Sequence, residues 1–244
     1  MNPPVQPIGA AAPSTPSALR VKICGLVREE DARLAGTSGA DVVGAVLVPS
    51  SPRFVTPERA GDLALAAGLP LAVVVAGLSP GEVVKAARTA RARIIQLHDD
   101  TPPEALERIR AEGEWELWKA ARVRSGHEME EAARRYGSLV DLLLLDAWHP
   151  RQLGGTGHRF PWSELEGCRD RLPNSLPLGV AGGLGPDSVA EAVRRLNPAL
   201  VDVSSGVERA PGEKDPEKVR SFVRQARASA ALDPSTSEPN TPSP

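Results

Sequence analysis

The chain of 244 residues carries 29 basic and 31 acidic side chains, for a formal net charge of −2. This length fits one large domain or two small ones, and the near-neutral charge excludes an unspecific nucleic-acid binder, which would carry a basic surplus. Two cysteines exclude a disulfide scaffold and favour a reducing, cytoplasmic location. No apolar run approaches the roughly 20 residues that span a bilayer, so we expect no membrane association.

The two ends of the chain differ in composition from the middle. Residues 1–18 contain five prolines and no charged side chain, and residues 228–244 contain four prolines and four serines. Neither stretch can bury enough apolar surface to offset the entropy of ordering it. We therefore expect disordered tails at 1–18 and 228–244, and one folded body at 19–227.

Within this body, apolar runs alternate with stretches rich in Ala, Arg, Glu and Leu. The expected strands are 20–24, 41–48, 70–75, 92–97, 115–121, 139–145, 177–180 and 200–203, and the expected helices are 28–37, 57–67, 80–90, 103–111, 127–136, 161–169, 186–196 and 215–227. This alternation predicts parallel strands with right-handed crossovers. At about 26 residues per unit, the α/β chain fits an eight-stranded (β/α) TIM barrel. An open doubly wound sheet is the alternative, but the first strand lacks the glycine fingerprint G-x-G-x-x-G after it.

Polar, reactive and glycine residues follow the ends of the expected strands. They are Cys24-Gly25, Ser51-Pro52-Arg53-Phe54, His98, Asp146, Gly154-Gly155-Thr156-Gly157, Gly182-Gly183 and Ser204-Ser205-Gly206. Active sites of such barrels lie at the carboxyl ends of the strands. The sequence therefore predicts a site at this rim of the barrel.

Two of these groups suggest a phosphate site. Gly182-Gly183 follows the seventh expected strand, and Ser204-Ser205-Gly206 follows the eighth. Glycines let backbone N–H groups approach an anion closely, and the loops after strands seven and eight are the recurrent phosphate site of this architecture. Either group alone could merely form a tight turn, but the two together favour a phosphorylated small-molecule substrate.

Cys24 and Asp146 are the candidate catalytic pair. A buried cysteine is often a packing residue, but Lys22 should point the same way along the strand and could raise the thiolate population of Cys24. Asp146 follows four leucines, and an acid in that place is seldom there for packing. Its alternatives are a helix N-cap or a salt bridge to a loop arginine. A carboxyl facing a thiol across a barrel mouth would form an acid–base pair.

The remaining polar residues each have two interpretations. Arg53 could hold a substrate carboxylate and would then be exposed until it arrives, or it could be one of many surface arginines. Asp202 lies within the eighth strand and could form an interior ion pair with Lys22. His98 is more often a satisfied hydrogen-bonding group than a catalyst. No cysteine–histidine cluster has the spacing of a metal site.

Seven stretches together carry a family resemblance. They are VKICGLVREEDA (21–32), SPRFVTPERA (51–60), IQLH (95–98), LLLDA (143–147), GGTGHRFPW (154–162), AGGLGPDSVAEAV (181–193) and VDVSSGVERAPGEKDPEKV (201–219). In content and order they resemble phosphoribosylanthranilate isomerase of tryptophan biosynthesis, over 20–227.

The resemblance implies an Amadori rearrangement of N-(5-phosphoribosyl)anthranilate to 1-(o-carboxyphenylamino)-1-deoxyribulose 5-phosphate, without cofactor or metal. It implies Cys24 as general base, Asp146 as general acid and Arg53 as the carboxylate ligand. It places Asp202 near the substrate amine or sugar hydroxyls, and the phosphate at Gly182, Gly183, Ser204, Ser205 and Gly206. The alternatives are a bifunctional isomerase that also serves histidine biosynthesis, an indole-glycerol-phosphate-forming barrel, and a non-catalytic phosphosugar-binding barrel. The chain is expected to be a monomer or a homodimer.

Overall fold

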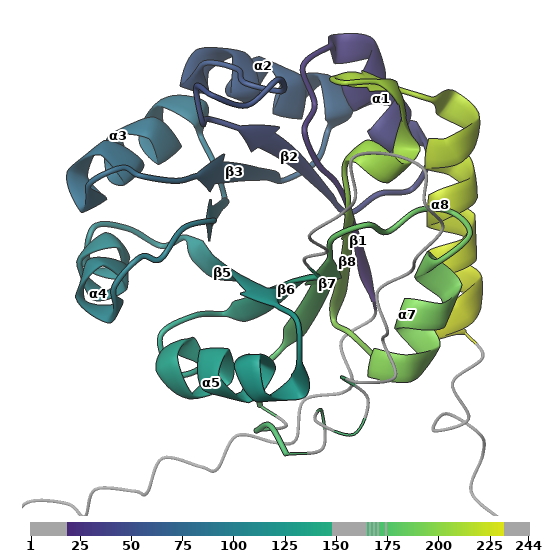
Figure 1. Cartoon of the computed structure of the whole chain (residues 1–244). Coiled ribbons are helices and arrows are strands. Elements are labelled where there is room, and N and C mark those ends of the chain that lie inside the picture. The colour runs from purple at the N-terminus through teal and green to yellow at the C-terminus, as the bar shows by residue number, and fades with distance from the viewer. Residues whose placement is uncertain are drawn as a thin grey trace, which may run out of the picture.

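The computed structural model describes residues 19–147, 165, 167, 169, 171–173 and 175–231. Eight parallel strands close into a barrel in the order β1 to β8, with helices around it (Figure 1). The predicted (β/α) barrel is therefore confirmed. The expected tail at 1–18, most of the expected tail at 228–244, and the glycine loop at 154–157 lie outside the described residues.

The strands and helices alternate along the chain. The barrel strands are β1 (Arg20–Ile23), β2 (Val42–Val46), β3 (Leu71–Val75), β4 (Ile94–Leu97), β5 (Glu116–Val123), β6 (Leu142–Ala147), β7 (Leu178–Ala181) and β8 (Leu200–Val203). The helices are α1 (Glu29–Thr37), α2 (Pro57–Ala67), α3 (Pro80–Ala90), α4 (Pro103–Ala111), α5 (Gly126–Tyr136), α7 (Val189–Leu196) and α8 (Pro216–Ala230). Of the helix expected at 161–169, the described residues 165, 167 and 169 are helical.

Local sequence explains where several helices begin. Thr56, Ser79 and Ser125 each accept a hydrogen bond from a backbone N–H in the first turn of the helix that follows. Asp215 does the same for α8. Proline occupies a first-turn position of α2, α3, α4 and α8, where its missing N–H leaves no bond unmade. These caps fix the residue at which α2, α3, α5 and α8 begin, and so where the loop before each of them ends.

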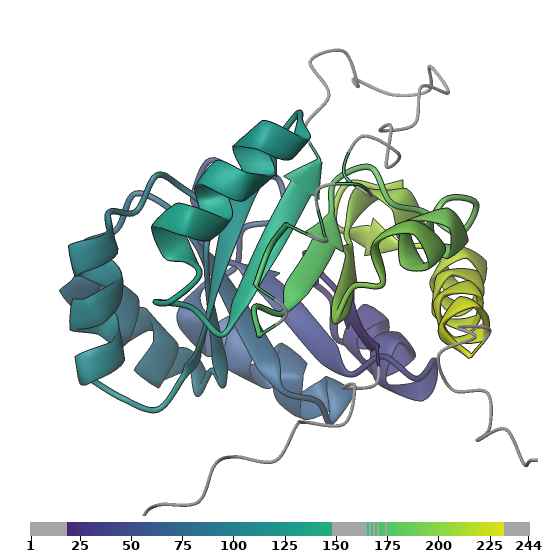
Figure 2. The same ribbon diagram turned by 90° about the horizontal axis from the view of Figure 1, so that it is seen from below.

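The core has two parts. A large apolar layer lies between the strands and the surrounding helices. A second, smaller cluster fills the barrel interior and includes Ile94, Trp118, Leu142 and Leu200, all almost completely buried. Helix α8 packs against both α7 and α1, so it closes the ring of helices beside β1 (Figures 1 and 2). The barrel interior is thus a packed core and not a channel.

The structure differs from the sequence expectation in the segment after β7. Helix α7 begins at Val189 rather than at 186, and α8 continues three residues past Arg227 to Ala230. The extension follows from helical spacing, because Ser229 is buried in line with Phe222 and Ala226. Between β8 and α8 lie a short 3-10 helix, η1 (Ser205–Val207), and an antiparallel hairpin of β9 (Glu208–Ala210) and β10 (Glu213–Lys214), which the sequence reading missed.

Candidate active site

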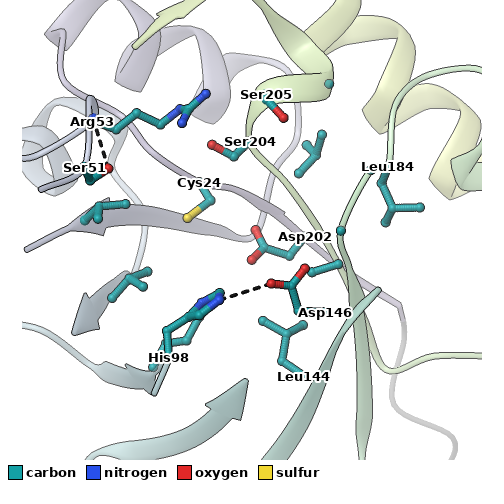
Figure 3. A pocket seen from close by; sticks show the side chains of 18 of the residues that line it. Cys24, Ser51, Arg53, His98, Leu144, Asp146, Leu184, Asp202, Ser204 and Ser205 are labelled. Atoms are coloured by element: carbon teal, nitrogen blue, oxygen red, sulfur yellow. Dashed lines mark hydrogen bonds and ion pairs between the residues drawn. The ribbon is translucent and has the colours of Figure 1, made fainter. Parts of the chain in front are cut away.

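A cavity of about 470 Å³ opens at the carboxyl ends of the strands. Its lining includes all nine site residues expected from the sequence, namely Cys24, Arg53, Asp146, Gly182, Gly183, Asp202, Ser204, Ser205 and Gly206. The side chains of Cys24, Asp146 and Asp202 point into the same space, although they come from β6, β8 and the end of β1 (Figure 3). Residues far apart in the sequence therefore share one pocket.

Cys24 follows β1 and is 7% exposed. The neighbouring strand makes room for it with Gly44, where an added Cβ would lie 2.7 Å from the Cys24 sulfur and 2.9 Å from Cε of Lys22. Burial raises the pKa of the Cys24 thiol, and the positive charge of Lys22 lowers it only in part. The expected gain in thiolate from Lys22 is therefore present, but desolvation outweighs it in the free protein.

Lys22 is completely buried in the barrel interior. Its Nζ donates hydrogen bonds to Oε1 of Gln96 at 2.8 Å and to Oδ2 of Asp202 at 2.7 Å. Burial lowers the pKa of Lys22, but attraction to Asp202 and Cys24 outweighs this and raises it overall. The ammonium group therefore stays charged at neutral pH, directly beneath the cavity.

The interior ion pair expected for Asp202 is observed, whereas its contact with a substrate stays a prediction. Its Oδ2 forms the interior salt bridge with Lys22. Its Oδ1 is also buried, and within the described part of the chain it accepts no hydrogen bond. Asp202 also lines the cavity, so a carboxylate oxygen that would normally be hydrogen-bonded lies without a donor in a residue of the cavity wall.

Asp146 lies near the end of β6 and forms an ion pair with His98, which directly follows β4. Its Oδ2 lies 3.1 Å from Nε2 of His98, with both side chains partly exposed to the cavity (Figure 3). The loop that follows Asp146 lies outside the described residues, so its two alternatives, a helix N-cap and a pair with a loop arginine, stay predictions. The observed partner of His98 is the proposed acid itself, in an ion pair.

Arg53 is held by an acid that the sequence reading did not select. Its Nε and Nη2 donate to the two carboxylate oxygens of Glu208 at 2.8 and 2.5 Å. The Arg53 side chain is 20% exposed, so the expectation of a guanidinium exposed until substrate arrives is wrong. A signal existed in the sequence, because Glu208 is a lone acid that directly follows the apolar residue Val207.

The loops after β7 and β8 lie against one another. Gly182 and Gly183 have φ of +81° and +66°, a region that favours glycine. A Cβ on Gly206 would lie 1.8 Å from the carbonyl oxygen of Leu184, so only glycine permits this approach. The first N–H groups of η1 have no partner within the helix itself. The two loops thus form one glycine-rich surface on the cavity wall.

Among residues 19–147 and the described part of 165–231, no group of three or more His, Cys, Asp and Glu side chains could hold a metal ion. No helix in the same part of the chain is long and apolar enough to cross a membrane.

Comparison with known proteins decides the family. The sequence model of N-(5'phosphoribosyl)anthranilate (PRA) isomerase matches residues 21–225. The chain belongs to this family. The N-(5'-phosphoribosyl)anthranilate isomerase of Microcystis aeruginosa is 41% identical over 210 residues, which cover 82% of this chain and 94% of the relative. As a member of the family, the protein is an isomerase of tryptophan biosynthesis.

Solved structures of PRA isomerases agree with the barrel described above. The crystal structure of the enzyme from Thermotoga maritima has a TM-score of 0.77 and 34% sequence identity, covering 86% of this chain and 99% of that one. Another PRA isomerase was solved in complex with reduced 1-(o-carboxyphenylamino)-1-deoxyribulose 5-phosphate, with a TM-score of 0.74, 32% identity and coverage of 86% and 99%. Both comparisons span nearly the whole length of the relative.

Proposed function

We propose that the cavity binds N-(5'-phosphoribosyl)anthranilate and converts it to 1-(o-carboxyphenylamino)-1-deoxyribulose 5-phosphate, with Cys24 and Asp146 as the catalytic residues. The observation that carries this proposal is that a thiol and a carboxyl from opposite parts of the sequence line one cavity beside glycine-rich loops. That arrangement supplies a base, an acid and an anion site for one small molecule.

The phosphate of the substrate is assigned to the loops after β7 and β8. Gly182, Gly183 and Gly206 bring backbone N–H groups to the cavity wall without intervening side chains. Ser204 and Ser205 add hydroxyl donors on the same side (Figure 3). Backbone N–H groups of this kind suit an anion with several acceptor oxygens.

The other end of the substrate carries a carboxylate, which we assign to Arg53. The guanidinium is always charged and lines the cavity. It is joined to Glu208, yet this pairing uses only part of its hydrogen-bonding capacity. The donors that Glu208 leaves unpaired can therefore bind the substrate carboxylate.

The first chemical step is the opening of the ribose ring. Protonation of the ring oxygen, as the anilino nitrogen pushes electrons toward the anomeric carbon, breaks the C–O bond and leaves a Schiff base. Asp146 supplies that proton and lies at the end of β6, open to the cavity. Its ion pair with His98 holds the carboxyl toward the cavity.

The second step is removal of the proton on C2′ of the Schiff base. The bonding electrons move into the C1′–C2′ bond, and the resulting enolamine tautomerises to the ketone. Cys24 accepts the proton as a thiolate. The charge of Lys22 favours the thiolate form of Cys24, whereas burial disfavours it. Cys24 lines the cavity, so its sulfur faces a substrate bound there. Asp202, with its free Oδ1, accepts a hydrogen bond from the substrate amine or a sugar hydroxyl.

A steady-state assay on two substrates tests the proposal. We expect turnover of N-(5'-phosphoribosyl)anthranilate in buffer treated with a metal chelator. Turnover of the aminoaldose of histidine biosynthesis as well would favour the bifunctional alternative, and turnover of neither would favour a binding barrel. We also propose a cytoplasmic location, supported by the free thiol of Cys24. The expected monomer or homodimer stays a prediction that light scattering can test.

A further inference from the structure

We propose that Glu208 is a positioning residue that fixes which edge of the Arg53 guanidinium faces the cavity, and so sets the affinity and specificity for a carboxylate-bearing substrate. This inference rests on the proposed role of Arg53. It gives a function to the acid in the string VDVSSGVE (201–208), which the catalytic roles leave unexplained.

The contact between Glu208 and Arg53 is bidentate. Oε1 accepts from Nε at 2.8 Å and Oε2 accepts from Nη2 at 2.5 Å. The side chain of Glu208 is 5% exposed and that of Arg53 is 20% exposed. Two parallel charge-assisted bonds in a shielded place fix both the position and the plane of a guanidinium.

The donors left on Arg53 determine how a ligand can approach. A guanidinium has five N–H groups, and the Glu208 pairing occupies the edge formed by Nε and Nη2. Within the described part of the chain, Nη1 donates no hydrogen bond to a protein acceptor. Because Arg53 lines the cavity, the edge formed by Nη1 and Nη2 is the one available to a carboxylate, which it can bind in a second bidentate pairing.

Glu208 is itself held in place by the segment that follows β8. Its Oε1 accepts from Nζ of Lys214 at 2.8 Å, and its backbone carbonyl accepts from Nζ of Lys218 at 3.0 Å. Hydrogen bonds from Arg53 and Lys214 outweigh the effect of burial and lower the pKa of Glu208, so the group is ionised at neutral pH. The β9–β10 hairpin therefore holds the Glu208 carboxylate in one position.

Lys214 also decides the charge of the cluster. Glu208 alone would neutralise Arg53 and weaken its attraction for an anion. The Lys214 side chain is completely buried and pairs with the same carboxylate. Burial lowers the pKa of Lys214, and the pairing with Glu208 opposes this change. With Lys214 protonated, the three side chains together carry one positive charge beside the cavity. Lys214 also donates to the carbonyl oxygen of Ser204 at 3.1 Å, which connects this cluster to the loop assigned to the phosphate.

A binding experiment with two ligands tests the proposal. Reduced 1-(o-carboxyphenylamino)-1-deoxyribulose 5-phosphate has both a carboxylate and a phosphate, whereas ribulose 5-phosphate lacks the carboxylate. We expect Glu208→Gln to weaken the first ligand by about 10- to 100-fold, because an amide can accept only one of the two bonds. It should leave the affinity for ribulose 5-phosphate unchanged, and raise KM for the substrate far more than it lowers kcat.

The controls separate this inference from the role of Arg53. Arg53→Met should weaken the carboxylate ligand, and in that background Glu208→Gln should add nothing. Glu217→Gln, on the exposed first turn of α8, should change neither ligand, and thermal melts of all variants report folding. Weakening by Arg53→Met but not by Glu208→Gln would overturn the positioning role alone, as would equal weakening of both ligands by Glu208→Gln. An unchanged carboxylate ligand in Arg53→Met would overturn the proposed role of Arg53 and this inference with it.

Discussion

The barrel interior contains two clusters of buried side chains that differ in chemistry. One is apolar, with Trp118 and Leu142 among its members, all supplied by inward-facing strand positions. The other consists of Lys22, Gln96 and Asp202, which are joined by hydrogen bonds of 2.7 and 2.8 Å. Both are almost entirely removed from solvent. The first cluster lowers the free energy of the folded state simply by burial, whereas the second must offset the cost of desolvating two charges.

This difference indicates which cluster exists for stability and which for chemistry. A buried ion pair is weak support for a fold, because apolar residues of similar volume often do as well. The charged cluster lies directly below Cys24 and the cavity, where its charges act on a reacting molecule. The two clusters should therefore respond to substitution in opposite ways, the apolar one in stability and the charged one in activity.

The largest effect is expected for the carboxyl at the cavity mouth. Asp146→Asn should lower kcat by about 100- to 10,000-fold, because an amide cannot donate the proton that opens the ring. Thermal stability should change little, because the ion pair with His98 that the change weakens joins two partly exposed side chains. Measured kcat within a few-fold of the unchanged enzyme would remove Asp146 from the acid role.

The next largest effect concerns stability and compares the two clusters directly. Lys22→Met leaves the buried carboxylate of Asp202 without its counter-charge and should cost about 3–5 kcal/mol of unfolding free energy. Adding Asp202→Asn removes that charge and should restore most of the loss while activity stays low. Leu142→Ala should cost about 2–5 kcal/mol and leave kcat/KM of the folded enzyme unchanged. Urea unfolding measures the stability of these variants, and steady-state kinetics measure their activity. Full activity in the double variant would show that the charged cluster is not needed for catalysis.

A smaller effect is expected in the pH dependence of the thiol. Because burial raises the pKa of Cys24, its alkylation by iodoacetamide should speed up with pH beyond the usual thiol pKa of about 8.5. Lys22→Met should shift this rise to still higher pH. The raised pKa also makes stability depend on pH. The contribution of Cys24 to the free energy of unfolding is fully present below the unfolded thiol pKa of about 8.5 and is lost as pH rises through the higher folded-state pKa. A Cys168→Ser background keeps the measurement specific, and a rate already constant at pH 7 would contradict the prediction.

The smallest effect is expected at the ends of the chain. Deleting 1–18 and 232–244 should change unfolding free energy by less than about 0.5 kcal/mol and leave turnover intact, because both stretches are poor in apolar residues that could pack. A cut at 228 should cost more, since it removes the buried Ser229 and the last turn of α8. Equal melting temperatures for the two C-terminal cuts would show that this turn adds nothing.

Much of the fold follows from local sequence. Apolar runs at eight places, with helical stretches between them, predict the barrel, and β3 and β8 lie within their expected ranges. The rim residues also follow, because strand ends in a barrel converge on one face. What the sequence could not supply is pairing between distant side chains, such as Arg53 with Glu208 and His98 with Asp146. Those depend on the closure of the barrel.

The missed elements have a related cause. The β9–β10 hairpin has strands of three and two residues, too short for an alternation of apolar and polar side chains to reveal. Its form depends on tertiary contacts of Glu208 and Lys214 instead. The prolines after α8 indicate a tail that begins too early, whereas the buried Ser229 continues the helical spacing of Phe222 and Ala226.

The most direct test of the account is the kinetics of Cys24→Ala with substrate labelled by deuterium at C2′. The account predicts that kcat falls by at least about 100-fold, while the affinity for reduced 1-(o-carboxyphenylamino)-1-deoxyribulose 5-phosphate and the melting temperature stay close to their original values. Cys24→Ser, which retains a weaker base, should show a larger deuterium effect on turnover than the unchanged enzyme. If Cys24→Ala instead turns over within a few-fold of the original rate, Cys24 is a packing residue and Asp202 becomes the first candidate for the base.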